Sequence, residues 1–281
     1  KTEGIYPNEY LIVCEKGNDR RRALGRYCHS KKGVVPLIPM REGVWGIYPK
    51  NMEQQFALDA LLNEEIKLVT LVGKAGTGKT LLAIAAGLEM TIGREKYNRL
   101  LVSRPVQPMG KDLGFLPGDL NDKVDPYLRP LYDALDDLLP SEKLNYFMST
   151  RIIEVAPLAF MRGRTLDNAF IILDESQNCT TTQLKMFLTR LGPSAKCIIT
   201  GDLSQIDLPG HQKSGLYRAL DILKNIKGIG QLFLTADDVV RHRLVKEIII
   251  KYDESDKTRT EERNRRYDNK NNRNAHKTEE E

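Results

Sequence analysis

The sequence predicts an α/β fold: a parallel sheet with helices on both faces, preceded by a small β module. From Pro49 onward, β-prone apolar runs alternate with helix-prone runs, which is typical of parallel sheets covered on both faces. One of these runs, Phe170 to Leu173, is wholly apolar, as expected for a strand buried on both sides. The 281 residues suffice for one such domain with a smaller appendage.

Changes in composition divide the chain into three parts. Residues 1–47 hold two strand-like runs, 10–14 and 33–38, and a basic cluster between them. We expect a small β module in which the basic cluster is a charged turn, either solvated or touching a phosphate backbone. Residues 48–252 form the main domain. Residues 253–281 are nearly all charged or asparagine, which predicts a disordered tail that is either merely solvating or a loose RNA contact.

The elements of the main domain follow in order. Asn51 is a favourable N-cap for a helix that runs through Leu62. A connection rich in glycine and proline is expected over residues 104–130, followed by an acidic helix. In chain order, strands are expected at 68–72, 100–103, 152–155, 170–173, 197–200 and 232–234, with helices at 81–86, at 131–139 and between the later strands.

Residues 73–80 read Gly-Lys-Ala-Gly-Thr-Gly-Lys-Thr, between a strand-like run and a helix-like run. In that context the backbone N–H groups of a glycine-rich loop converge at a helix N-terminus and bind phosphate. Lys79 is expected to reach the β- and γ-phosphates, and the Thr80 hydroxyl to ligate Mg²⁺. The residues predicted to cradle the nucleotide phosphates are Gly73, Lys74, Ala75, Gly76, Thr77, Gly78, Lys79 and Thr80.

Two adjacent carboxylates, Asp174 and Glu175, follow the apolar run that ends at Leu173. Ligands of open α/β sheets bind at the carboxyl ends of the strands, so Asp174 is expected to hold the hydrated Mg²⁺. Glu175 is placed to orient and polarise the attacking water. Two acids beside a buried strand are costly unless a cation or water satisfies them, so the pair predicts hydrolysis of the triphosphate.

Two amide side chains complete the predicted nucleotide site. Gln205 follows the strand that ends in Thr200-Gly201-Asp202, where a carboxamide can sense the γ-phosphate. Gln54 lies upstream of the first strand of the main domain, and a glutamine can pair with the N6/N7 edge of adenine. Gln55 is an alternative reader, and either residue can instead be a solvated helix residue. The sequence has no Asn-Lys-x-Asp guanine reader, which also favours ATP.

The composition limits the kinds of binding partner that can be expected. A formal net charge of +5 and a pI near 8.9 are compatible with nucleic acid but do not demand it. No apolar run reaches the length of a membrane span, so no membrane contact is expected. The cysteines form no Cys-x-x-Cys pair and the histidines no His-Glu-x-x-His motif, which favours reduced thiols in a cytoplasmic protein. The chain begins at Lys1, so a preceding segment would not be visible here.

Several motifs of the main domain resemble known ATPases. The loop at 73–80, Asp174-Glu175-Ser176-Gln177-Asn178 and Gly201-Asp202-Leu203-Ser204-Gln205 are similar to the first RecA-like domain of superfamily one helicases. The chain also resembles the PhoH-like ATPases from about Pro49 to Tyr252, through Ser103-Arg104-Pro105, Leu113-Gly114-Phe115-Leu116-Pro117-Gly118-Asp119, Lys123-Val124-Asp125-Pro126-Tyr127-Leu128-Arg129-Pro130 and Met161-Arg162-Gly163-Arg164-Thr165. Residues 1–47 resemble the connector that follows the nuclease domain in PIN–PhoH proteins. No PIN acidic cluster is present, so no nuclease activity is transferred.

The resemblance implies a cytoplasmic RecA-like P-loop ATPase linked to RNA, with RNA binding, unwinding or remodelling as its work. It also suggests roles for Arg104, Arg162 and Arg164 at nucleic acid, with nucleotide phosphate as a second possible ligand of Arg104. Each of these arginines can instead be a salt-bridged surface residue. The alternative function is an ATP-driven switch acting on a protein partner, such as a linked PIN nuclease.

Efficient hydrolysis predicts a further arginine. Two-domain helicases take a transition-state arginine from a second RecA-like domain, and the sequence after Gln205 is too short for one. Such an arginine is worth about 10³–10⁵ in rate. We therefore expect a homo-oligomer, such as a ring, in which a neighbouring copy supplies Arg241, Arg243 or Arg218.

Overall fold

A computed structural model describes residues 5–16, 18–106, 120–209, 212–235 and 251. All of these except residue 251 belong to one compact unit, Lys1–Asp238. The predicted tail of residues 253–281 therefore lies outside the described residues. None of the helices in the described part of the chain combines the length and the apolar character that crossing a membrane requires. Of the four free cysteines, Cys14 is exposed and the other three are buried.

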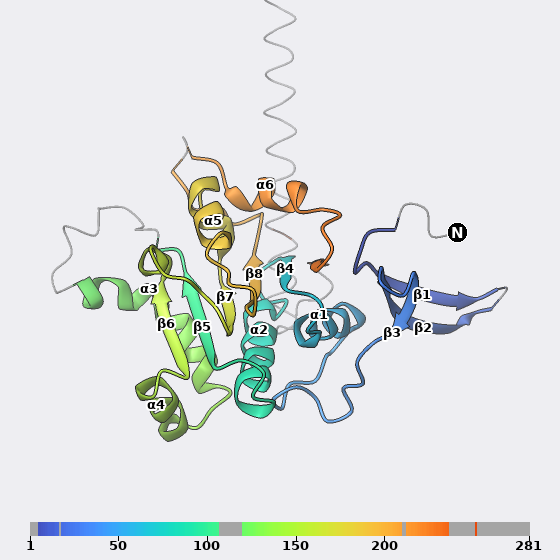
Figure 1. Ribbon diagram of the computed structural model, residues 1–281, viewed down its shortest axis with the longest axis horizontal. Helices are drawn as coiled ribbons and strands as arrows, with labels where there is room; N and C mark the ends of the chain where they lie inside the picture. Colours follow the sequence, from blue (N-terminus) through green and yellow to red (C-terminus); the bar gives the residue numbers. More distant parts are fainter. Residues whose placement is uncertain (1–4, 17, 107–119, 210–211, 236–250, 252–281) are drawn as a thin grey trace, which may run out of the picture. The chain divides into compact units, whose positions relative to one another are not determined.

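The described strands form two sheets (Figure 1). The first is antiparallel, with β1 (Tyr10–Glu15), β2 (Asn18–Cys28) and β3 (Gly33–Pro36) in that order. The second contains β4 (Leu68–Gly73), β5 (Arg99–Arg104), β6 (Ile153–Pro157), β7 (Ala169–Leu173), β8 (Lys196–Gly201) and β9 (Ile229–Leu234). Its six strands are parallel, in the order β6-β5-β7-β8-β4-β9. These sheets confirm the predicted α/β class with a preceding β module.

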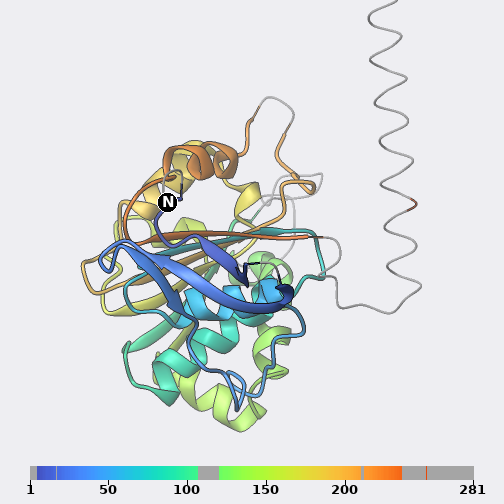
Figure 2. The same cartoon turned by 90° about the vertical axis from the view of Figure 1, so that its right-hand side faces the viewer.

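Helices cover both faces of the parallel sheet (Figure 2). On one face lie α1 (Met52–Leu62), α2 (Lys79–Leu88), α3 (Leu120–Asp136) and α4 (Ser141–Ser149). On the other face lie α5 (Thr181–Leu188) and α6 (Gly215–Ile222). Asn51 caps α1 as predicted, since its side chain accepts a hydrogen bond from the Gln54 amide.

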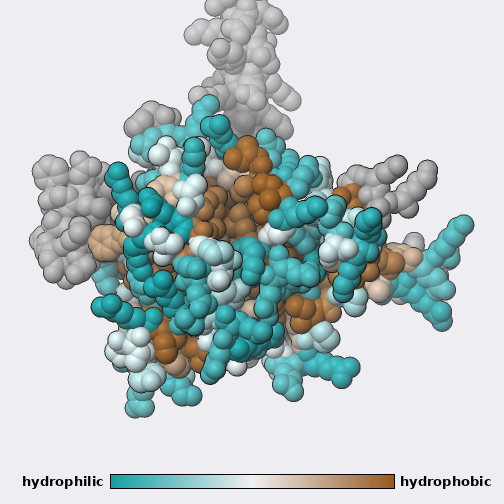
Figure 3. Space-filling view, viewed as in Figure 1, coloured by the Kyte–Doolittle hydropathy of each residue, from teal (hydrophilic) through white to brown (hydrophobic). Residues whose placement is uncertain are grey.

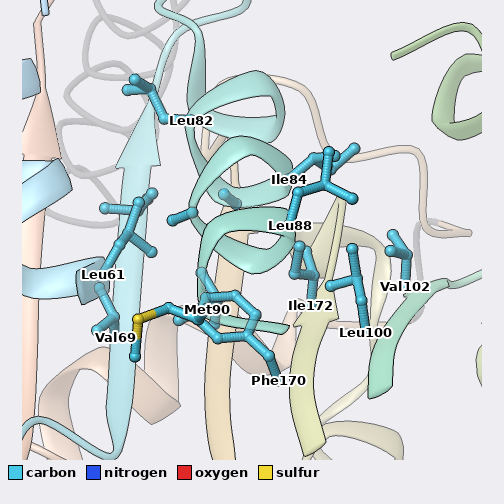
Figure 4. Close-up of a cluster of buried hydrophobic side chains, with 14 of the residues drawn as sticks. Leu61, Val69, Leu82, Ile84, Leu88, Met90, Leu100, Val102, Phe170 and Ile172 are labelled. Atoms are coloured by element: carbon cyan, nitrogen blue, oxygen red, sulfur yellow. The ribbon is translucent and has the colours of Figure 1, made fainter. Parts of the chain in front are cut away.

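Alternate residues of the central strands pack on opposite faces, which explains why β7 is apolar throughout. Phe170 and Ile172 of β7 belong to the cluster beneath α1–α4, whereas Ile171 and Leu173 belong to the cluster beneath α5 and α6. Figure 4 shows part of the first cluster, with labelled side chains from α1, α2, β4, β5 and β7. The face seen in Figure 3 is mostly hydrophilic, with hydrophobic side chains in one area at its upper centre and in smaller areas elsewhere.

The expected connection over residues 104–130 is wrong from Leu120 onward, where α3 begins. Two prolines, Pro126 and Pro130, lie inside this helix, and each removes one backbone hydrogen bond. The helix nevertheless forms because a stripe of its side chains is buried in the core, which offsets that loss. The buried residues of this stripe are Val124, Leu128, Leu131 and Leu135.

Most of the basic cluster of the β module lies on a strand and not in a turn, because Asn18–Cys28 forms strand β2, whereas Lys31 and Lys32 lie in the turn that follows. Arg26 of this strand is buried and lies 3.5 Å from the carboxylate of Asp59 in α1. The same carboxylate accepts hydrogen bonds from the Tyr10 hydroxyl at 2.8 Å and from the Ile38 amide at 2.7 Å. Asp59 therefore fastens the β module to α1, and Arg26 is a structural residue.

Lys196, the first residue of β8, is fully buried. Its ammonium donates to the backbone carbonyls of Ala60 at 2.9 Å, Asn63 at 2.8 Å and Ile66 at 2.5 Å. These carbonyls lie at the end of α1 and in the turn after it, where a cation is favoured. Burial lowers the pKa of Lys196 to about 7, and the positive charge of Lys67 acts in the same direction.

We expect Lys196→Met to lower the free energy of unfolding by about 2–4 kcal/mol, because it leaves buried carbonyls without a donor. The unfolded chain holds the Lys196 proton up to the ordinary pKa of 10.5, whereas the folded protein releases it near 7. Wild-type stability relative to the variant should therefore rise with pH above 7. Urea unfolding from pH 7 to 9 measures both effects. Lys143→Met, at an exposed lysine of α4, is the control, and an equal loss of stability there would contradict the structural role of Lys196.

Candidate phosphate-binding and hydrolytic site

The loop of residues 73–80 lies between β4 and α2, as the sequence predicts. Gly76 and Gly78 have φ values of +83° and +86°, which side chains other than glycine rarely adopt. Helix α2 begins at Lys79, directly after Gly78. The first N–H groups of α2 have no partner within the helix, so this end suits an anion.

Gly73 is required for a reason that the sequence did not reveal. It is the last residue of β4 and pairs with Leu234 of the neighbouring strand β9. A Cβ at this position would lie 2.6 Å from the carbonyl oxygen of Leu234, which is backbone and cannot move aside easily. The close approach of β9 therefore explains this glycine, and its contact with phosphate stays a prediction.

Gln54 supports the phosphate loop from α1. Its side chain is buried and donates to the carbonyl of Thr77 at 3.1 Å. Its amide oxygen accepts a hydrogen bond from the backbone of Lys50 at 2.9 Å. Both ends of this amide are thus bonded within the protein, and a contact with adenine would require these bonds to change. Gln55 beside it is only partly buried.

The ammonium of Lys79 lies against the loop itself. It donates to the carbonyl oxygens of Gly73 at 2.6 Å and Lys74 at 2.9 Å. Thr77 closes the same turn by donating its hydroxyl to the carbonyl of Lys74 at 2.9 Å. The ammonium is therefore held at the loop that is predicted to surround the phosphates.

Asp174 joins three elements at the carboxyl edge of the sheet. Its buried carboxylate follows β7, and the same oxygen accepts hydrogen bonds from Thr80 at 2.7 Å and from Thr200 at 2.5 Å. Thr80 belongs to α2 and Thr200 to β8, which lies between β4 and β7. These groups are all hard oxygen donors, the kind that Mg²⁺ prefers, so they fit the predicted metal. The sequence predicted Thr80 and Asp174 but missed Thr200.

Glu175 is a non-glycine residue with a φ of +50°, a sparsely populated conformation that is typical of functional sites. Its Oε1 lies 3.7 Å from the Arg104 guanidinium at the end of β5. Its Oε2 accepts a hydrogen bond from the side-chain amide of Gln177. Both carboxylate oxygens of this residue therefore have partners.

Gln177 connects Glu175 with the predicted sensor loop. Its buried amide also donates to the Gln205 carbonyl at 3.0 Å, and its oxygen accepts from the Asp202 backbone at 2.9 Å. The carboxylate of Asp202 accepts in turn from the Ala75 backbone in the phosphate loop, at 2.9 Å. The side chain of Gln205 is exposed. Sequence analysis did not assign a role to Gln177, because this link depends on the sheet order.

The predicted nucleic-acid arginines differ in their surroundings. Arg164 donates to both carboxylate oxygens of Glu154, at 2.5 and 2.9 Å, and this bonding lowers the pKa of Glu154. Arg164 is thus the salt-bridged residue that the sequence left open as an alternative. Arg162 is exposed two residues earlier. Arg241 and Arg243 lie outside the described residues, and Arg218 is exposed on α6.

The fold and this site define a P-loop protein with a RecA-like parallel sheet. The profile of the PhoH-like protein family matches residues 46–253. A PhoH-like protein of Mycobacterium tuberculosis is 52% identical over 206 residues, which cover 73% of this chain and 58% of the relative. A Bacillus subtilis PhoH-like protein is 52% identical over 204 residues, which cover 73% of this chain and 63% of the relative. The chain belongs to the PhoH-like family.

Other similarities are more distant. Protein PhoH of Escherichia coli is 41% identical over 208 residues, covering 73% of this chain and 58% of the relative. The match thus spans about three fifths of these relatives' length. Among solved structures, the Sulfolobus solfataricus SWI2/SNF2 ATPase core with dsDNA has a TM-score of 0.36 and 18% identity over 55% of this chain and 34% of its own. Candida albicans Pif1 helicase has a TM-score of 0.34 and 12% identity, and the match covers 67% of this chain and 40% of the helicase chain.

Proposed function

We propose that this protein binds ATP with Mg²⁺, hydrolyses it, and couples hydrolysis to the binding and remodelling of single-stranded RNA. The contact between Thr80 and Asp174 carries the proposal, because it joins the phosphate loop to the acidic strand end at 2.7 Å. A hydroxyl and a carboxylate in this arrangement hold the nucleotide's metal in P-loop enzymes. Glu175, the next residue, then lies beside the place where the γ-phosphate would be.

Each residue has a defined task in this proposal. The ammonium of Lys79 exchanges its two loop carbonyls for phosphate oxygens, and the N–H groups at the start of α2 bind the same anion. The Mg²⁺ held by Thr80 and Asp174 neutralises phosphate charge when it is bound. Glu175 accepts the proton of the attacking water. The water oxygen bonds to the γ-phosphorus as the bond to the ADP oxygen breaks, which yields ADP and inorganic phosphate.

Glu175→Gln should keep affinity for ATP and lose hydrolysis, by about 100-fold or more, because an amide cannot accept the proton. Lys79→Ala should weaken ATP binding itself, because the phosphates lose their ammonium partner. Phosphate release and the binding of a fluorescent ATP analogue measure the two effects separately. Glu142→Gln, an exposed carboxylate on α4, is the control. Unchanged hydrolysis in Glu175→Gln would remove the proposed proton acceptor.

A surface next to the site supports the proposed RNA contact. The short turn of residues 158–161 after β6 has buried Leu158 and Met161 on its inner side. It leaves Phe160 42% exposed, and the exposed Arg162 follows it. The strands are parallel, so this turn lies at the same edge of the sheet as the phosphate loop. An aromatic ring beside a guanidinium can stack on a base and pair with a phosphate.

Phe160→Ala should weaken single-stranded RNA binding at least about fivefold, since stacking on one base contributes about 1–3 kcal/mol. Fluorescence anisotropy with a labelled uridine oligomer at several salt concentrations measures the affinity. Tyr146→Ala is the matched control, because Tyr146 is an aromatic residue of α4 that is 60% exposed. Equal affinities of wild type and Phe160→Ala would exclude this turn. RNA that neither binds nor stimulates hydrolysis would favour the switch acting on a protein partner.

We further propose that a neighbouring copy completes the site. Most of the phosphate-loop residues stay partly exposed, so the site is open to solvent on one side. An arginine from a second copy, with Arg241 as the first candidate, would reach the γ-phosphate from that side. Mixing Arg241→Ala with Lys79→Ala subunits should then restore part of the hydrolysis, because some interfaces would combine an intact loop with an intact arginine. A monomeric mass by sedimentation with ATP present would contradict this.

A further inference from the structure

Both carboxylate oxygens of Glu175, the proposed proton acceptor, have partners in the structure. Oε1 of Glu175 faces Arg104 at 3.7 Å, and Oε2 faces the amide of Gln177. A general base must lie within hydrogen-bond reach of the water whose proton it takes, and a carboxylate oxygen that faces a guanidinium is directed to that group instead. One of the two contacts must therefore loosen before Glu175 can take a proton from water efficiently.

Of these two contacts of Glu175, the one with Arg104 is the one that another ligand can replace. Gln177 is 1% exposed, and its amide makes hydrogen bonds to two backbone groups besides Glu175. The side chains of Arg104 and Glu175 are 22% and 33% exposed, respectively. Their 3.7 Å separation is longer than a charge-assisted hydrogen bond of about 2.7–2.9 Å. Gln177 therefore fixes one oxygen, whereas Arg104 restrains the other weakly and from the solvent side.

Arg104 also lies between the proposed hydrolytic site at Glu175 and the turn proposed to bind RNA. It is the last residue of β5 and pairs with Pro157 of β6, after which the turn with Phe160 begins. On its other side, β5 pairs with β7, and the Asp174 amide donates to the Ser103 carbonyl at 2.8 Å. A phosphate bound near Phe160 would therefore be close to the guanidinium that restrains Glu175.

We propose that Arg104 is a positioning residue that restrains Glu175 until RNA binds, an inference that rests on the proposed ATP hydrolysis. A backbone phosphate of RNA offers the guanidinium two oxygens in a fork geometry, which competes well with one carboxylate oxygen at 3.7 Å. When the guanidinium turns to the phosphate, Oε1 of Glu175 is released to accept the water proton. RNA binding thus raises the rate of hydrolysis without any change in the nucleotide contacts.

The test compares Arg104→Gln with wild type in steady-state ATP hydrolysis, with and without polyuridine. Without RNA, the variant should show a kcat about two- to fivefold above wild type, the range expected for loss of a partly exposed ion pair. Stimulation by polyuridine should fall toward one, and the KM for ATP should stay within about twofold, because nucleotide contacts are unchanged. Arg104→Lys should keep part of the stimulation, because it keeps the charge without the fork.

Arg94→Gln is the matched control, since it removes a comparable pair with Glu89, at 2.8 Å, near the far end of α2. It should leave both basal and stimulated rates unchanged. A lower basal kcat or a raised KM for ATP in Arg104→Gln would show that Arg104 serves the nucleotide and would overturn the inference. Unchanged basal rate with full stimulation would overturn it as well. Absence of hydrolysis in the wild type would instead refute the proposed function itself.

Discussion

The carboxylate of Asp174 is the group on which the arrangement of the site depends. Its Oδ1 accepts hydrogen bonds from Thr80 at the start of α2 and from Thr200 of β8, which are 94 and 26 residues away in sequence. Burying a carboxylate costs free energy unless its oxygens accept hydrogen bonds. These bonds therefore hold α2, β7 and β8 in fixed positions relative to one another. The phosphate loop and the acidic strand end can meet only because β8 brings a small hydroxyl residue between them.

Beside Asp174, a second series of polar contacts leads from buried to partly exposed residues. Asp202 bonds to the phosphate loop at Ala75, Gln177 bonds to Asp202 and to Glu175, and Glu175 meets Arg104 at the surface. The inner members are buried and hydrogen-bonded to backbone, so they are rigid. The outermost pair is longer and partly exposed, so it can change partner at low cost. Rigid positioning and a replaceable contact are thus both present at one strand end.

The sequence predicted the parts of this structure that depend on local pattern. The phosphate loop, the Asn51 cap and the strands before Asp174 and Asp202 were all recognised from neighbouring residues, and the structure brings Thr80 to Asp174 as expected. What it did not predict depends on tertiary context. Helix α3 forms despite Pro126 and Pro130 because its stripe is buried, and Gln177 acquires its role only because β8 lies next to β7. Neither effect is visible in a local window of sequence.

Ionisable side chains at the two edges of the parallel sheet have different kinds of partner. At the amino edge, the ammonium of Lys196 is held by three backbone carbonyls, which cannot be exchanged without unfolding the end of α1. At the carboxyl edge, Asp174 and Glu175 are held by side chains and Lys79 by loop carbonyls, all of which can give way to a phosphate, a metal or water. Lys196 at the first edge therefore has a structural role, through its hydrogen bonds. The charged groups at the second edge make contacts that a ligand can replace, and catalytic turnover requires such replacement.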